Sequence, residues 1–110
     1  MAKNDMTRII YCILTELYEC MKQGVVVNKA DVSYERFGIP YSYWLDIVIE
    51  TQERGYIKGV MCRMTKGTGR AVNYDDIAIT LDGVEYLENN STMQKVKEAQ
   101  KDIKDIVPMI

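Results

Sequence analysis

The sequence contains no histidine. Histidine is the commonest general base and metal ligand in proteins, so its absence excludes a zinc site, a Ser-His-Asp triad and a Cys-His pair built within the chain. The sequence also has no P-loop and no dinucleotide-binding fingerprint, and its carboxylates show no spacing typical of a metal or glycosidase site. We therefore expect no enzymatic activity, no metal and no cofactor.

Cysteine is scarce and long apolar runs are missing. Cys12, Cys20 and Cys62 are odd in number and form no C-x-x-C pair, which is typical of small hydrophobic residues in a reducing compartment. No uncharged apolar run approaches the roughly 18 residues of a membrane-spanning helix. The polar start "MAKND" is not followed by a secretory apolar region. We expect a cytoplasmic protein with no membrane association.

The remaining composition is that of an ordinary soluble protein. Hydrophobic residues make up 47% of the 110 residues and charged residues 27%. This length suits one domain with a modest core. We predict a single domain over residues 1–110, with a core in residues 1–89 and a C-terminal helix at about 91–106.

Apolar residues at three- and four-residue intervals predict three helices in the first half of the chain. The first begins near Asp5 and ends at Gly24, and residues 25–27 are extended. A short helix, capped by Asn28 or Asp31, ends at Gly38. The third begins at or beside Pro40, where a missing N–H does no harm, and ends at Gly55.

The periodicity changes after the third helix. We expect "YIKGVMCRM" and "YDDIAIT" to form two strands around the glycine-rich "TKGTGR", and "LDGVEYLENN" to form a short helix. Ser91 with Gln94 predicts a capping box at the start of the last helix. The fold class is therefore α+β, with the order helix, helix, helix, hairpin, helix, helix.

The third helix occupies the position of the DNA-reading helix in helix-turn-helix proteins. Its apolar arc faces the core, and Ser42 and Tyr43 are the candidates for contact with base edges near its N-terminus. The same polar side carries Asp46, Glu50 and Glu53, which phosphates would repel. This face argues against strong sequence-specific binding by the helix alone.

The hairpin has the opposite charge. Residues 56–74 contain Lys58, Arg63, Lys66 and Arg70 and no acid, a balance of +4, whereas the whole chain has a net charge of −2. We expect these four side chains to project together from the two-stranded arm and to contact the backbone or minor groove of duplex DNA. The alternative is a solvated hairpin tip, in which glycine and lysine serve turn geometry and solubility.

Several ordered blocks of the sequence resemble a known family. "IIYCILTELYECM", "GIPYSYWLDIVIETQERGYIKGV", "IAITLDGVEYLENNSTM" and "IKDIVP" are similar to the YjcQ-like proteins of Gram-positive bacteria and their prophages. The resemblance covers nearly the whole chain. It implies a winged helix-turn-helix fold with a three-helix core, a β-hairpin wing and extra C-terminal helices. "ITLDGVEYL" also resembles the turn after the wing in many winged-helix regulators, where Thr80 would cap the next helix.

Two functions follow as hypotheses. The first is a small DNA-binding or regulatory protein, of prophage origin by the resemblance, that contacts phosphates through the wing. The second is a winged-helix scaffold used as a protein-interaction module without DNA binding, which the sequence pI of about 5.1 and the aromatic residues Tyr41 and Tyr43 favour.

The last helix carries an apolar stripe of Met93, Val96, Ile103 and Ile106 between charged flanks. This stripe predicts a homodimer formed through the C-terminal helix, because two-fold symmetry would double the phosphate contacts. The alternative is that the stripe packs back onto the first helix of the same chain.

Overall fold

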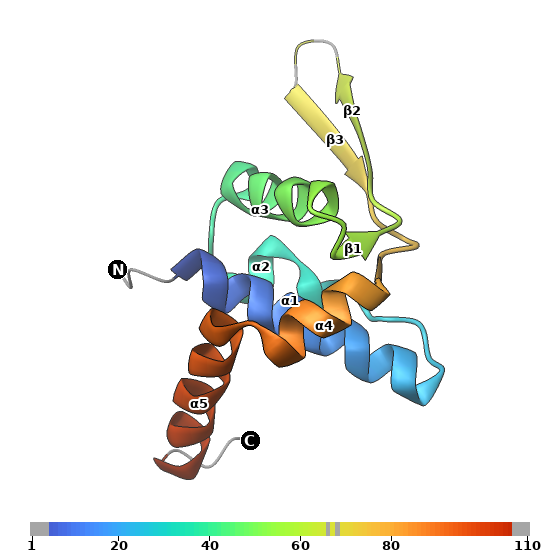
Figure 1. Cartoon of the computed structure of the whole chain (residues 1–110). Coiled ribbons are helices and arrows are strands. Elements are labelled where there is room, and N and C mark those ends of the chain that lie inside the picture. The colour runs from blue at the N-terminus through green and yellow to red at the C-terminus, as the bar shows by residue number, and fades with distance from the viewer. Residues whose placement is uncertain (1–4, 66, 68, 107–110) are drawn as a thin grey trace.

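The computed structural model describes the backbone of residues 5–65, 67 and 69–106, and the side chains of residues 6–64, 67 and 69–99. Its elements follow one another in the order α1 (Asp5–Gln23), η1 (Lys29–Val32), α2 (Tyr34–Phe37), α3 (Tyr41–Glu53), β1 (Ile57–Lys58), β2 (Met61–Thr65), β3 (Gly69–Asn73), β4 (Ala78–Ile79), α4 (Leu81–Asn89) and α5 (Ser91–Ile106). The fold is α+β with a winged-helix arrangement, as predicted (Figure 1).

The core lies between α1 and the elements around it. Helix α1 contributes Ile9, Ile13, Leu14 and Leu17, all at most 3% exposed, on the side that the heptad-like spacing predicts. Helices α3, α4 and α5 and strand β4 all pack against α1. Within the described ranges, no helix has both the length and the apolar content to cross a membrane.

The turns around α3 form as the sequence predicts. The Asn28 side chain accepts a hydrogen bond from the backbone N–H of Ala30 and caps η1. Gly38 ends α2 in the left-handed conformation, with φ of 67°. Pro40 stands at the N-cap of α3, so its lack of an N–H removes no helical hydrogen bond.

The strand prediction is correct only in part. The projecting arm pairs β2 with β3, and β3 begins at the end of the glycine-rich segment and ends before the predicted second strand. Of the predicted second strand, only β4 is extended, and it pairs with β1 at the base of the arm. A turn separates β3 from β4, in which Ile77 N–H donates to the carbonyl oxygen of Tyr74. Strand β3 has no buried face, so it lacks the apolar alternation that reveals a half-buried strand.

Thr80 caps α4 in the way the sequence predicts. Its hydroxyl accepts a hydrogen bond from Gly83 N–H at 3.0 Å and donates to the Gly55 carbonyl at 2.5 Å, which also ties α4 to the end of α3. The capping box expected from Ser91 is wrong. Asn90 is the cap, because its Oδ1 accepts from the N–H groups of Thr92 and Met93, while Gln94 donates back to the carbonyl oxygen of Glu88.

Helix α5 packs against α1 and α4 of the same chain. Met93 is 0% exposed and Val96 is 4% exposed, so neither side chain is available to a second copy. For these two residues the predicted dimer contact is wrong, because the apolar stripe here covers the monomer core. The side chains of Ile103 and Ile106, the other two residues predicted to dimerise, lie outside the described residues.

Candidate nucleic-acid interface

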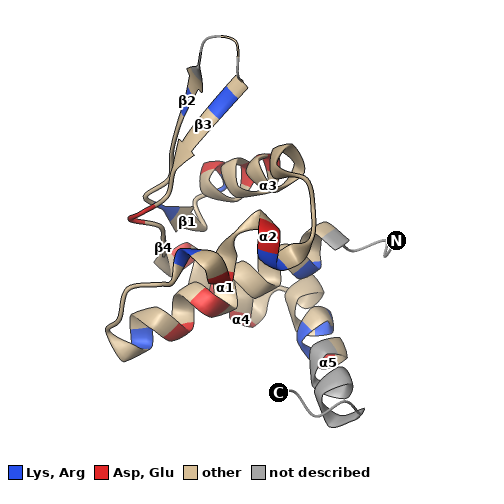
Figure 2. Cartoon of the chain, turned by 180° about the vertical axis from the view of Figure 1, so that it is seen from behind, with Lys and Arg blue, Asp and Glu red and all other residues tan. Residues whose placement is uncertain are grey.

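The candidate interface combines α3 with the arm formed by β2 and β3, which we call the wing. The wing extends beyond α3 on the side of the molecule opposite α5 (Figure 1). Seen from behind, Lys and Arg lie on β1, β2 and β3, and Asp and Glu lie on α3 beside the wing (Figure 2). The structure therefore places the acidic helix and the basic strands next to each other.

Helix α3 exposes the polar side chains predicted for its outer face, except Tyr43. Ser42 is exposed, as expected for the polar side of this helix, and so is Asp46. Tyr43 is half-buried and packs against the core cluster, so it is not a free contact for a base edge. Tyr41 is likewise half-buried, which removes the support that the two tyrosines gave to an exposed aromatic surface.

The wing has two faces, and the strand register assigns its basic residues to them. Arg63 lies opposite Ala71, whereas Arg70 lies opposite Met64. Residues that are directly opposite in an antiparallel pair share a face, and neighbours along a strand alternate. Arg63 and Arg70 therefore point to opposite faces.

The expectation that four basic side chains project together is wrong. Arg70 faces α3, Arg63 points away from α3, and Lys58 lies on β1 at the base of the wing. Lys66 is outside the described residues. The net charge of +4 in residues 56–74 thus does not produce one basic surface. Successive side chains of a β-strand point to opposite faces, so the basic residues are divided between them.

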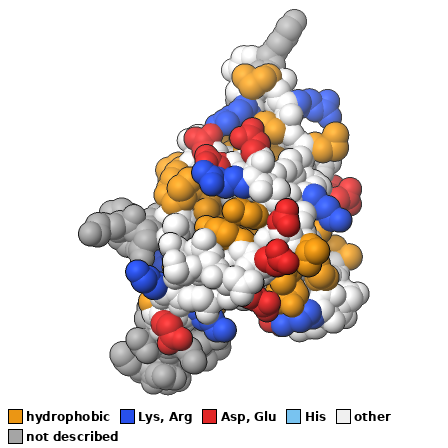
Figure 3. Space-filling view, in the orientation of Figure 1, with side chains coloured by type: hydrophobic (Ala, Val, Ile, Leu, Met, Phe, Trp, Pro, Cys, Tyr) orange, Lys and Arg blue, Asp and Glu red, His pale blue; other side chains and the backbone are white. Residues whose placement is uncertain are grey.

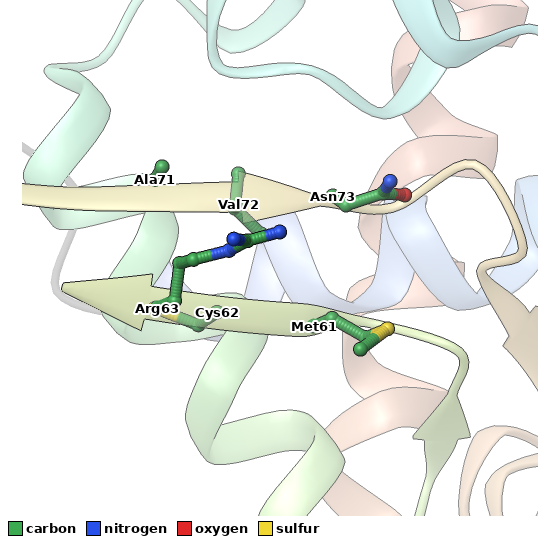
Figure 4. A pocket seen from close by; sticks show the side chains of 6 residues that line it. All are labelled: Met61, Cys62, Arg63, Ala71, Val72 and Asn73. Carbon is green, nitrogen blue, oxygen red and sulfur yellow. The ribbon is translucent and has the colours of Figure 1, made fainter. Parts of the chain in front are cut away.

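The outer face of the wing is shallow and mostly apolar. A hollow of about 370 Å³ on the wing is lined by Met61, Arg63, Ala71 and Asn73 of this face and by Cys62 and Val72, whose register positions belong to the other face. Figure 4 shows the Arg63 side chain reaching from β2 toward β3. Arg63 is exposed, and no described residue forms an ion pair with it. Its guanidinium is therefore available to an anion.

The inner face of the wing is fastened to α3. Arg70 Nη1 lies 2.9 Å from Asp46 Oδ1, and the Tyr41 hydroxyl donates to the Arg70 carbonyl oxygen at 3.4 Å. Burial raises the pKa of Tyr41 above its ordinary value, Cys62 adds to the rise and Arg70 opposes it. The hydroxyl therefore stays protonated at neutral pH and can donate this bond.

The carboxylates of α3 are less repulsive than the sequence suggests. Asp46 is paired with Arg70, and Glu50 accepts from the guanidinium of Arg54 at 3.1 and 3.2 Å. Acidic and basic side chains accordingly lie beside one another below the wing in the space-filling view (Figure 3). Glu53 has no ion-pair partner among the described residues. Two of the three negative charges on this helix are thus locally compensated.

Two further contacts fix the base of the wing. The Gln52 side chain donates from Nε2 to the Val60 carbonyl and accepts from Val60 N–H, both at 2.9 Å. Trp44 is fully buried, donates from Nε1 to the Val32 carbonyl at 2.9 Å, and packs edge-on against Tyr74 with the ring centroids 5.2 Å apart. Helix α3 therefore holds the chain on both sides of the wing, before β2 and after β3.

Sequence reasoning missed Gln52, Tyr41 and Asp46 as residues that position the wing. Their partners lie in the wing or next to it, far along the chain for Tyr41 and Asp46. Periodicity reports only which side of a helix a residue occupies, so it carries no signal for such pairs. One signal for the ion pair was available in the sequence. Asp46 lies in the acidic third helix, and Arg70 lies in the basic segment that follows it.

Comparison with known protein families gives a match over most of the chain. The family model described as YjcQ protein matches residues 11–106 of the chain. Neither the curated proteins nor the solved structures gave a match. The matched region contains most of α1 and every later element up to the end of α5. The chain belongs to the YjcQ family.

Proposed function

We propose that this chain is a small DNA-binding regulatory protein that holds duplex DNA mainly through phosphate contacts from its wing. The observation that carries the proposal is the projecting wing, whose outer face exposes Arg63 and whose base carries the exposed Lys58, in a segment without acidic residues. Arg63 supplies an exposed guanidinium without an ion-pair partner in the described structure. Contacts to phosphates position a protein on DNA without reading its sequence.

The proposal includes weak sequence preference. Base edges are usually read by Arg, Lys, Asn or Gln at the start of the recognition helix. Helix α3 offers Ser42 there, and the next exposed polar residue along it, Asp46, is held by Arg70. We expect the protein to act in the cytoplasm, where its three cysteines remain free thiols.

The binding of random duplex DNA at two salt concentrations tests this proposal. Three phosphate contacts, from Arg63 and Lys66 of the wing segment and from Lys58 at its base, give a slope of about −3 in a plot of log affinity against log salt. Affinity should therefore fall about 40-fold between 50 and 200 mM salt. Fluorescence anisotropy with a labelled duplex measures both values. Undetectable binding at 50 mM salt, or binding that is insensitive to salt, would overturn the proposal.

A second candidate is a protein-interaction module, and the exposed methionines of the wing favour it. Met61 is 72% exposed and Met64 is 74% exposed, on opposite faces of the wing. Flexible apolar side chains of this kind are common at protein-binding surfaces. The same titration separates the candidates, because a wing used only on proteins gives no salt-dependent binding of duplex DNA.

A further inference from the structure

The pair formed by Arg70 and Asp46 joins the wing to the helix in the recognition position. It is reinforced by the Tyr41 hydroxyl, which binds the backbone of the same arginine. The side chain of Arg70 is thus held by a carboxylate and its carbonyl by a phenol, both from α3. With these two contacts β3 lies against α3 at the level of Arg70.

The pair is accessible to a competing anion. The side chain of Asp46 is 63% exposed and that of Arg70 is 32% exposed, so water reaches both groups. Exposed ion pairs are weak because water solvates both partners and salt screens them. A phosphate offers the same guanidinium a charge-assisted, bidentate contact. Arg70 can therefore exchange Asp46 for a phosphate without the unfolding of any element.

Asp46 opposes the binding of DNA in two ways. While it holds Arg70, the wing has one cation fewer for the backbone of the duplex. Once Arg70 has moved to a phosphate, the carboxylate of Asp46 is left unpaired beside a polyanion. The carboxylate of Glu53, on the same helix, has no basic partner in the described structure. It can therefore lower the affinity for DNA only by repelling phosphates.

We propose that Asp46 is an autoinhibitory residue: it sequesters Arg70, and the wing gains Arg70 as a phosphate contact only when the pair opens. This inference rests on the proposed function, since it concerns the affinity of the wing for DNA. Sequestration of Arg70 can be distinguished by experiment from simple repulsion of DNA by the Asp46 carboxylate. The effect of Asp46 depends on Arg70, whereas simple repulsion by a carboxylate does not.

Asp46→Asn tests the inference in the full chain with random duplex DNA. At 50 mM salt we expect the affinity to rise about 10-fold and the salt slope to become steeper by about one, as for one added phosphate contact. In the Arg70→Ala background the same substitution removes only the repulsion of phosphates by one carboxylate, so its gain should be clearly smaller. Glu53→Gln is the matched control, because it removes a carboxylate of α3 that no arginine holds, and it should give a clearly smaller gain.

The outcomes distinguish the inference from the proposed function. If no form of the protein binds DNA at 50 mM salt, both fail. If the wild type binds but Asp46→Asn gains no more than Glu53→Gln, or gains equally without Arg70, only the autoinhibitory role is overturned. A readout without DNA completes the test, since hydrogen exchange at Arg70 Nη1, the atom that contacts Asp46, should be faster in Asp46→Asn than in the wild type. Equal exchange rates would show that the pair does not form in solution and would overturn the inference.

Discussion

Replacing Lys58, Arg63 and Lys66 together by Ala should abolish the binding of duplex DNA. With three phosphate contacts removed, affinity at 50 mM salt should fall on the order of 10³-fold and the salt slope should approach zero. Arg63 is the exposed guanidinium of the outer face, Lys58 is exposed at the base of the wing, and Lys66 belongs to the same basic segment of the sequence. The measurement is an anisotropy titration of the variant beside the wild type.

A variant with the same change in charge at the far side of the molecule provides the control. Lys22, Lys95 and Lys97 are exposed lysines on α1 and α5, and the wing lies at the opposite end from α5 (Figure 2). Their replacement by Ala should lower the affinity far less than the wing triple variant does. If the two triple variants lose affinity equally, the binding comes from net charge alone and the wing has no special part in it.

Trp44→Ala should lower the free energy of unfolding by about 3–5 kcal/mol, the usual cost of truncating a buried aromatic residue. Trp44 is 0% exposed and its indole N–H donates to the Val32 carbonyl, so truncation leaves both a cavity and an unpaired carbonyl. Its ring also contacts Tyr41 and Tyr74, which border the wing. Since small domains are stable by only about 5–15 kcal/mol, this loss would leave little of the fold.

Urea unfolding followed by circular dichroism measures this loss without relying on tryptophan fluorescence. Trp44→Phe is the matched control, since it keeps an aromatic ring in the core and removes the indole N–H. It should cost less than Trp44→Ala, with the loss of the hydrogen bond contributing about 1–3 kcal/mol. A loss below about 1 kcal/mol in Trp44→Ala would contradict the role of Trp44 as the packing centre of α3.

The helices could be predicted because each has a buried side that repeats with the helical period. The apolar arc of α3 that was expected to face the core includes Trp44, Ile47 and Val48, and all three are at most 1% exposed. Strand β3 could not be predicted in the same way. Its residues alternate between exposed and half-buried, so hydrogen bonds to β2 define it rather than a hydrophobic face.

The site was harder to predict than the fold. The sequence located the basic segment but not the faces to which Arg63 and Arg70 belong, because these depend on the register of β2 with β3. It identified the stripe that includes Met93 and Val96, but not the surface that this stripe covers. A stripe of apolar side chains indicates that this side of the helix is buried, but it does not identify the surface that buries it. The packing of α5 shows that this surface belongs to α1 and α4.

The most direct test of the proposed function is to map the bound DNA on the protein. Amide chemical shifts of the labelled chain, followed during titration with a random duplex at low salt, report which residues meet the DNA. We predict that the largest changes lie in the wing, residues 61–73, and in the first turn of α3 around Ser42. Changes confined to α4 and α5, or no changes at all, would contradict the account.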